Sequence, residues 1–191
     1  AFVRVTSSGS DDLEAEESDN FNVGLLYQPT DKLDIKLDYW KVDYTNLITV
    51  ENSQGKLAAD INGPDIVRSA TGTLAGVYVD YFNSSSVDVE GIDLEVQYKM
   101  SDNLNLGVNV AHFLQYDITA PTGDVIEAAG YFNNNNFARS MPETKANVVL
   151  AWSNGEQDAS LNISYISDYQ HSQPVDPMGI SSYTTADAQY G

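Results

Sequence analysis

Apolar and polar residues alternate along three long stretches of the chain, and each stretch is interrupted once by a short polar segment. In residues 145–169 one apolar phase runs from Ala146 to Trp152 and resumes from Ala159 to Tyr165, on either side of residues 153–156. A period of two is typical of a strand with one apolar and one polar face, and a short polar interruption is typical of a hairpin turn. The stretch therefore predicts an antiparallel hairpin, although alternation alone does not tell whether its apolar face meets a protein core or lipid.

The same design occurs twice more along the chain. Residues 21–39 alternate around a turn at 29–32, and residues 92–114 alternate around a turn at 101–103. The turn positions hold the Pro, Asp, Asn and Gly residues that tight turns need. With two partial strands near Phe2–Val5 and Thr184–Tyr190, we predict an all-β chain of about eight antiparallel strands in up-and-down order. Helical periodicity is scarce, and only residues 56–70 offer room for a short turn of helix.

The connections alternate strictly between short and long. Three turns span a few residues, whereas three segments are far longer than the usual connection in a compact domain. The short turns are 29–32, 101–103 and 153–156, and the long segments are 46–86, 117–144 and 168–182. Short turns at one end and long loops at the other are typical of outer-membrane β-barrels.

Aromatic residues are placed near both ends of these strands. Tyr27, Tyr98 and Trp152 precede the three short turns, while Tyr39 and Tyr165 lie toward the long loops. Tyr and Trp combine an apolar ring with a polar tip, so this placement predicts two membrane-interface belts. The competing interpretation is that β-proteins are rich in aromatics in general.

The other face of the predicted strands is very polar, which fits a water-filled or plugged lumen but also the outer face of a soluble sandwich. Two strands change phase, one after Tyr39 and one at Gly91. We expect either a β-bulge at these points or a strand that rises above the membrane.

Composition excludes several classes of function. The chain has 9 Lys+Arg against 28 Asp+Glu, a net charge of -19, and no cysteine. Such a chain repels nucleic acid and anionic lipid surfaces, and it has no disulfide, thiolate metal site or catalytic cysteine. No apolar run approaches the length of a membrane helix, and the amino terminus has no signal-peptide features. Both ends interrupt alternating stretches, so we expect a piece of a longer protein.

Particular segments resemble a known family. DLEAEESDNFNVGLLYQPTDKLDIKLDYWKVDYTNLI (12–48) closely resembles a late-barrel segment of TonB-dependent outer-membrane receptors. VEGIDLEVQYKMSDNLNLGVNVAHFLQYD (89–117) is similar to the strand pair that follows, and SMPETKANVVLAWSNGEQDASLNISYISDY (140–169) to the next hairpin. YTTADAQYG (183–191) resembles the start of a near-terminal strand. Each motif is weak alone, but together they cover nearly the whole chain in the family's order.

The resemblance implies that residues 1–191 are an arc of a 22-stranded transmembrane barrel closed by a plug. Such receptors lie in the outer membrane of Gram-negative bacteria and import ferric siderophores, haem, cobalamin or oligosaccharides with energy supplied through TonB. The implied partners are outer-membrane lipid, the remainder of the barrel with its plug, the TonB complex and a small-molecule or oligosaccharide substrate. Neither a cofactor nor an enzymatic activity is implied. The plug and the remaining strands are absent from these residues.

Candidate ligand contacts lie in the long segments, where receptors place them. Aromatics stack on sugars or chelates, and an arginine pairs with an anionic chelate; the competing interpretation is that these side chains pack the loops together. The candidates are Tyr78, Tyr81, Phe82, Tyr131, Phe132 and Arg139. His112 and His171 lack metal-ligand spacing, the acidic stretch 10–19 lacks that of an EF-hand, and no catalytic motif is present.

Two other architectures fit the alternation. A complete eight-stranded barrel requires the strand near Phe2–Val5 to pair with the strand near Thr184–Tyr190. A soluble carbohydrate-binding β-sandwich requires the apolar face to be buried against a second sheet. The positions that test the sandwich are Ile35, Val96, Leu106 and Leu161.

Overall fold

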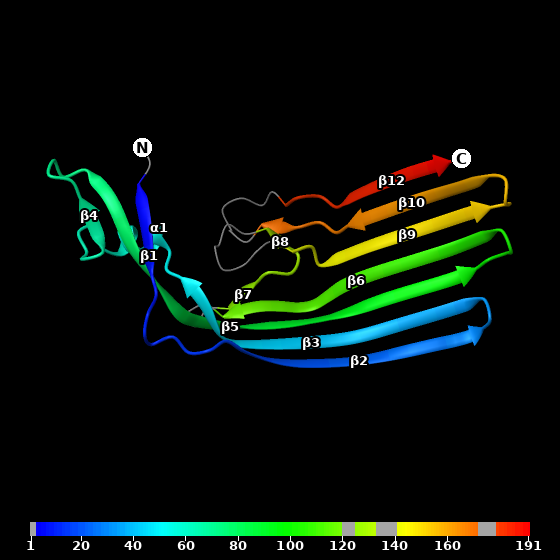
Figure 1. The fold of residues 1–191 in the computed structure, drawn as a ribbon, viewed down its shortest axis with the longest axis horizontal. Coiled ribbons are helices and arrows are strands. Elements are labelled where there is room, and N and C mark those ends of the chain that lie inside the picture. Colours follow the sequence, from blue (N-terminus) through cyan, green and yellow to red (C-terminus); the bar gives the residue numbers. More distant parts are fainter. Residues whose placement is uncertain (1–2, 120–124, 133–140, 172–178) are drawn as a thin grey trace.

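Seven long antiparallel strands lie side by side in chain order and form one continuous curved sheet (Figure 1). The computed structural model describes residues 3–119, 125–132, 141–171 and 179–191. The seven strands are β2 (Glu17–Thr30), β3 (Leu33–Val50), β5 (Leu74–Lys99), β6 (Leu104–Thr119), β9 (Thr144–Ser153), β10 (Asp158–Ile166) and β12 (Tyr183–Tyr190). The predicted fold class, an all-β up-and-down meander forming an arc, is confirmed.

Short turns join the strands in pairs at one end of the sheet (Figure 1). In the turn between β9 and β10, Asn154 Oδ1 accepts from the backbone N–H groups of Glu156 at 3.0 Å and Gln157 at 2.9 Å. Gly155 takes a φ of 92°, which glycine adopts without steric cost. Local turn chemistry therefore fixes the register of this hairpin, as the sequence predicted.

The first long connection is more ordered than predicted. Residues 46–86 were expected to be a loop, but β3 continues to Val50 and β5 begins at Leu74, with α1 (Ser53–Ala59) and β4 (Ile66–Arg68) between them. Val77 and Val79 of β5 are both 2% exposed. Burying these two valines lets β5 run far beyond the rest of the sheet (Figure 1).

The amino-terminal strand is parallel to its partner, whereas the sequence predicted antiparallel strands throughout. β1 (Arg4–Ser8) lies parallel to the extended part of β5, with register from Arg4 opposite Gly76 to Ser8 opposite Asp80. It is therefore not a further strand of the meander. Ser8 Oγ donates to Asp80 Oδ1 at 2.5 Å and helps to hold this pairing.

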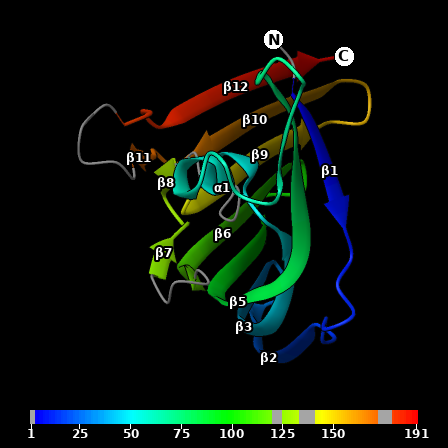
Figure 2. The ribbon, with the colours of Figure 1, turned by 90° about the vertical axis from the view of Figure 1, so that its left-hand side faces the viewer.

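The other two long connections are tied to each other and to β6. β7 (Val125–Glu127) pairs with the end of β6, and β8 (Tyr131–Phe132) pairs in parallel with β11 (Gln170–His171). Ala128, which is fully buried, packs with Val87 and Ile118 in a small apolar cluster. Ala128, directly after β7, is thus held against the sheet. Figure 2 shows β7 and β8 beside β6.

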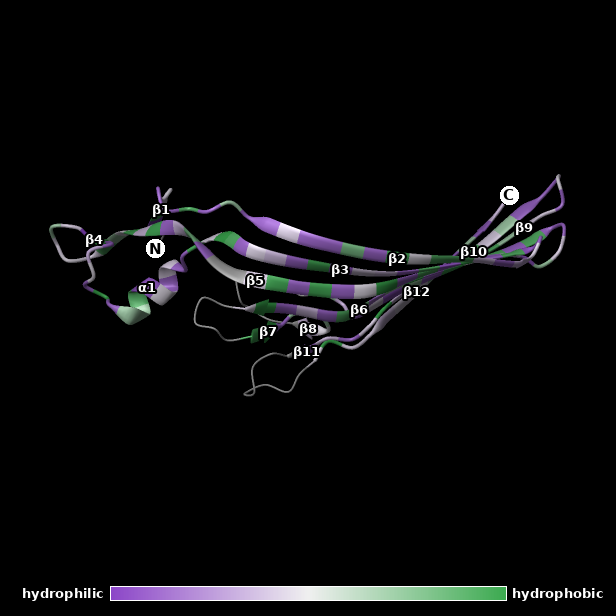
Figure 3. Cartoon of the chain, turned by 90° about the horizontal axis from the view of Figure 1, so that it is seen from below, coloured by the Kyte–Doolittle hydropathy of each residue, from purple (hydrophilic) through white to green (hydrophobic). Residues whose placement is uncertain are grey.

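The open sheet contradicts both alternative architectures. β2 and β12 are its two edges, and they do not pair with each other or with β1, so the closed eight-stranded barrel is wrong. The only other sheet among the described residues is the short β8–β11 pair, and the long strands form a single layer (Figure 3). Leu161 is 37% exposed, so the sandwich is wrong too. Within the described ranges, no helix is long and apolar enough to cross a membrane.

Candidate functional site

Cross-strand register aligns the apolar positions of all seven strands into rows on one face. One row in the middle of the sheet contains a residue from every strand, and each member is apolar or aromatic. It consists of Tyr27, Ile35, Val96, Val108, Val148, Ile163 and Ala186. Rows on this face follow one another two residues apart from the row of Trp152 to the row of Tyr39, which spans about 27 Å along the strands. His112, Thr144 and Thr184 are polar members of the two rows nearest Tyr39.

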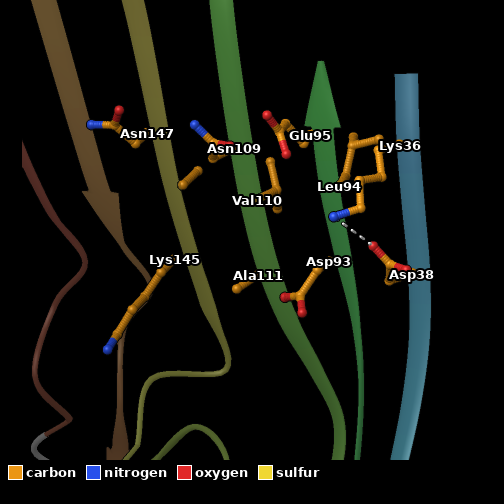
Figure 4. Close-up of a pocket in the computed structure, with 11 residues that line it drawn as sticks. Lys36, Asp38, Asp93, Leu94, Glu95, Asn109, Val110, Ala111, Lys145 and Asn147 are labelled. Atoms are coloured by element: carbon orange, nitrogen blue, oxygen red, sulfur yellow. Dashed lines mark ion pairs between the residues drawn. The ribbon is translucent and has the colours of Figure 1, made fainter. Parts of the chain in front are cut away.

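The opposite face is polar and concave. A row that is offset by one residue from the apolar row contains Lys36, Glu95, Asn109, Asn147 and Ser164. The first four of these side chains line a hollow of about 400 Å³, together with Asp38, Asp93 and Lys145 (Figure 4). Because the hollow lies on the polar face, the apolar rows are on the convex face of the arc.

Both faces exchange polarity just beyond Tyr39. On the side of this row that leads to the long connections, the convex face carries Lys41 and Asp43, while the concave face carries Val42 opposite Val89. The register between β3 and β5 continues unbroken from Leu33 to Tyr44, so the change of phase in these two strands comes from the sequence and not from a bulge between them.

Next to this exchange, the pairing of β5 with β6 contains a β-bulge. β6 inserts one residue, Leu114, between the partners of Glu90 and Gly91, and this side chain is 48% exposed. Because of this insertion, Phe113 and Tyr116 both face the concave side. The apolar side chains of β6 therefore change faces at the same level as those of β3 and β5. The bulge expected at Gly91 is therefore present in the pairing of β5 with β6, with its extra residue on β6. That the strands rise above the membrane here stays a prediction.

The convex face beyond the exchange carries an unbroken row of carboxylates. Five adjacent strands contribute one each, in direct register: Asp19, Asp43, Asp88, Asp117 and Glu127. Like charges in register destabilise a sheet. Lys41 Nζ offsets part of this repulsion through its ion pair with Asp43 at 2.8 Å. The Tyr39 hydroxyl donates to Glu90 Oε2 at 2.7 Å, which links the last apolar row to this polar zone.

We expect Asp88→Asn to stabilise the fold at neutral pH. Burial raises the pKa of Asp88 above its ordinary 3.8, and the neighbouring Asp43 raises it further. A carboxyl whose pKa is raised on folding costs stability when it is ionised, and this cost disappears as the pH falls through the raised pKa. The difference in melting temperature between the variant and the parent should therefore be positive at pH 7 and shrink toward pH 4. A difference that is negative at pH 7, or that grows on acidification, would contradict the assignment.

The five predicted interface aromatics all lie on the convex face, in the apolar rows. Tyr27 shares the middle row, Tyr98 lies one row closer to the turns, and Trp152 lies one row closer still. Tyr39 occupies the last apolar row, and Tyr165 the row before it. Their role at a membrane interface stays a prediction.

The predicted ligand-contact residues do not gather into one site. Tyr78, Tyr81 and Phe82 lie along the extended part of β5, where Tyr78 is 48% exposed. Tyr131 and Phe132 form β8, and a hydrogen bond with Glu127 raises the pKa of Tyr131. No ring contact among the described side chains links Tyr78 or Tyr81 with Tyr131. Arg139 lies outside the described residues.

Sequence reasoning missed an aromatic cluster of Trp40, Phe113 and Tyr116, called the aromatic ledge below, at the end of the polar concave face that leads to the long connections. Trp40 meets Phe113 edge-to-face at 5.8 Å, and Phe113 stacks with Tyr116 at 5.9 Å. Trp40 lies over Gly91, where a Cβ would come within 2.6 Å of the indole. The signal was present: Trp40 opens the shifted phase of its strand, and a glycine stands directly opposite it.

Comparisons with known proteins agree with this geometry. Residues 2–191 match the family model described as TonB dependent receptor-like, beta-barrel. The chain belongs to this family. Its members are transport receptors of the outer membrane rather than enzymes. No curated protein sequence matches the chain.

Solved structures of the same fold include three receptors for iron or siderophores. The ferric enterobactin receptor PfeA from Pseudomonas aeruginosa, in complex with enterobactin, has a TM-score of 0.67 and 21% identity over 97% of this chain and 25% of its own. The siderophore receptor PirA from Acinetobacter baumannii has 0.64 and 15% over 97% and 26%. The FrpB iron transporter from Neisseria meningitidis has 0.63 and 13% over 96% and 25%. The chain thus spans about a quarter of each.

Proposed function

We propose that this chain is part of the wall of an outer-membrane receptor that binds a ferric siderophore and imports it with energy delivered through TonB. The observation that carries the proposal is the match of residues 2–191 to the receptor barrel family. The similarity to the ferric enterobactin receptor PfeA, the siderophore receptor PirA and the iron transporter FrpB favours iron chelates over the other family cargoes, haem, cobalamin and oligosaccharide. The plug domain, the remaining strands, the TonB complex and lipid are the proposed partners, in a Gram-negative bacterium.

The apolar rows support a lipid-facing role for the convex face. Tyr27, Tyr98 and Trp152 lie on β2, β5 and β9. Each step from one of these strands to the next crosses two strands and moves the aromatic residue two positions closer to the turns. One residue per strand is ~3.4 Å along the strand against about 4.8 Å between strands, a slope of about 35°. That slope falls within the range of strand tilts in outer-membrane barrels. A single membrane plane through all three aromatics therefore fits a tilted barrel.

The two ends of the sheet are assigned to opposite sides of the membrane. We assign the short turns to the periplasm and the long connections to the extracellular side, as in other outer-membrane barrels. Tyr78, Tyr81, Phe82, Tyr131, Phe132 and Arg139 then stay candidates for the first contacts with the chelate. The concave hollow faces the lumen and the plug.

Uptake in cells tests the proposal. Cells that lack other iron receptors and express the full-length receptor should take up radiolabelled iron from ferric chelates. Deletion of tonB, or a protonophore, should reduce this uptake to background while binding at the cell surface persists. Uptake that continues without TonB, or surface binding of none of the chelate classes, would overturn the proposal.

A further inference from the structure

Beyond the row of Tyr39, toward the long connections, most of the described basic side chains bind groups of the protein itself. Lys41 pairs with Asp43 at 2.8 Å, and Lys56 pairs with Glu51 and with Asp65. This leaves little of either charge for a ligand. Burial alone would lower the pKa of Lys56, but its hydrogen bonds to the two carboxylates outweigh burial and raise it.

Arg68, whose planar guanidinium is the group best suited to an anion, donates to backbone carbonyls instead. Its Nη1 bonds to the Gly72 oxygen at 2.9 Å, and its Nη2 to the Ile61 oxygen at 2.9 Å. Among the described residues beyond the row of Tyr39, Arg4 on β1 is the remaining basic side chain.

The lumen-facing hollow has an excess of negative charge. Asp38, Asp93 and Glu95 line it together with two lysines, and Lys36 already pairs with Asp38 at 3.6 Å. Figure 4 shows Lys145 extended away from these carboxylates. With 28 acidic against 9 basic residues in the whole chain, the field along this wall repels anions.

Neutral hydrogen-bonding groups occupy the adjoining part of the same face. Asn147 Nδ2 donates to Asn162 Oδ1 at 2.6 Å and to Ser164 Oγ at 3.0 Å, and Asn109 lies opposite Asn147 on β6. The aromatic ledge of Trp40, Phe113 and Tyr116 lies just above. Amides, hydroxyls and ring faces suit an uncharged ligand that has both polar and apolar surface.

We propose that the cargo carries no net negative charge: it is a ferric chelate of the trihydroxamate class rather than of the tris-catecholate class. Three hydroxamates balance the three charges of Fe(III), whereas three catecholates leave three negative charges on the complex. This inference rests on the proposed function and adds the charge class of the substrate. A triply anionic chelate would meet net repulsion along this wall, because the acidic side chains of the chain far outnumber its basic ones.

Association rates of the full-length receptor with the two chelates, measured over a range of ionic strength, test the inference. A ferric trihydroxamate should bind at a rate that changes little with salt and at least tenfold more tightly than a ferric tris-catecholate. The rate for the tris-catecholate should rise with salt, because screening weakens repulsion. Tighter binding of the tris-catecholate, at a rate that falls with salt, would overturn the inference and leave the proposed function intact. Binding of neither chelate would also overturn the inference, whereas the proposed function itself fails only if none of the chelate classes binds.

A matched pair of variants locates the repulsion. Asp93→Asn with Glu95→Gln removes two charges from the hollow, and Asp19→Asn with Asp117→Asn removes two from the convex carboxylate row. The first variant should raise the association rate of the tris-catecholate about fivefold relative to the trihydroxamate, since charges about 10 Å apart still interact at physiological salt. The second should leave this ratio unchanged. The ratio cancels any effect on assembly or plug contacts, and an unchanged ratio in the first variant would contradict the proposal.

Discussion

Val108→Arg is expected to prevent the full-length receptor from assembling in the outer membrane. Val108 lies in the middle apolar row of the convex face, in register with Val96 on one side and Val148 on the other. A charged residue at the middle of the lipid-facing band costs about 2–4 kcal/mol in an outer-membrane barrel. The fraction of receptor that stays folded in detergent without heating should therefore fall sharply, and surface expression should fall with it.

Asn109→Arg is the control for this variant. Asn109 neighbours Val108 on the same strand but lines the polar hollow, so its arginine can reach water. Assembly of this variant should match that of the parent. Equal loss in both variants would mean that β6 tolerates no arginine on either face, and equal tolerance would show that the convex face does not meet lipid.

Gly91→Ala is the second substitution with a large expected effect. A Cβ at this position would lie 2.6 Å from Trp40 Cζ2 and 2.8 Å from the backbone oxygen of His112. The indole can move away, but the backbone of β6 can do so only by disturbing its pairing with β5. Such overpacking costs about 1–3 kcal/mol, which denaturant unfolding of the purified receptor measures directly.

Gly107→Ala provides the comparison, since it makes the same change on the same face of the neighbouring strand. Its Cβ would meet only the side-chain amide of Gln97, at 3.3 Å, and that amide ends a flexible side chain. Its unfolding free energy should stay within about 0.5 kcal/mol of the parent. If the two alanine variants are equally stable, the aromatic ledge does not depend on the missing Cβ at Gly91.

The hairpins were predictable because alternation and turn chemistry are local. Residues 145–169 contain in one short segment both the phase that pairs Leu150 with Leu161 and the Asn154–Gly155 turn that sets the register. The distance of each predicted interface aromatic from a turn can be counted along the chain in the same way, whereas its role at a membrane interface stays a prediction.

The extended part of β5 was not predictable from local pattern. Its Val77 and Val79 belong to a segment without a partner nearby in sequence, and they are buried only because β1 and β4 pair with the strand from distant positions. Parallel pairing of β1 across about seventy residues leaves no trace in alternation. The expected loop was therefore a strand.

For a different reason, the sequence did not reveal the aromatic ledge. Trp40 follows Tyr39 directly in the sequence, but the two side chains point to opposite faces. The alternation was followed as one apolar face, whereas the faces exchange polarity beyond Tyr39. Only the unbroken register between β3 and β5 distinguishes such an exchange from a bulge.

The most direct measurement is the accessibility of spin labels placed along β3 of the full-length receptor in membranes. Residues 1–191 contain no cysteine, so none of them competes with a single cysteine introduced in this segment. Labels at Leu37 and Tyr39 should be relaxed by lipid-soluble oxygen, and labels at Lys41 and Asp43 by a water-soluble nickel chelate. A label at Asp38, on the concave face, should be inaccessible to oxygen from the lipid. Oxygen accessibility that continues through Lys41 and Asp43, or that is equal at Leu37 and Asp38, would contradict a lipid-facing convex band that ends at Tyr39.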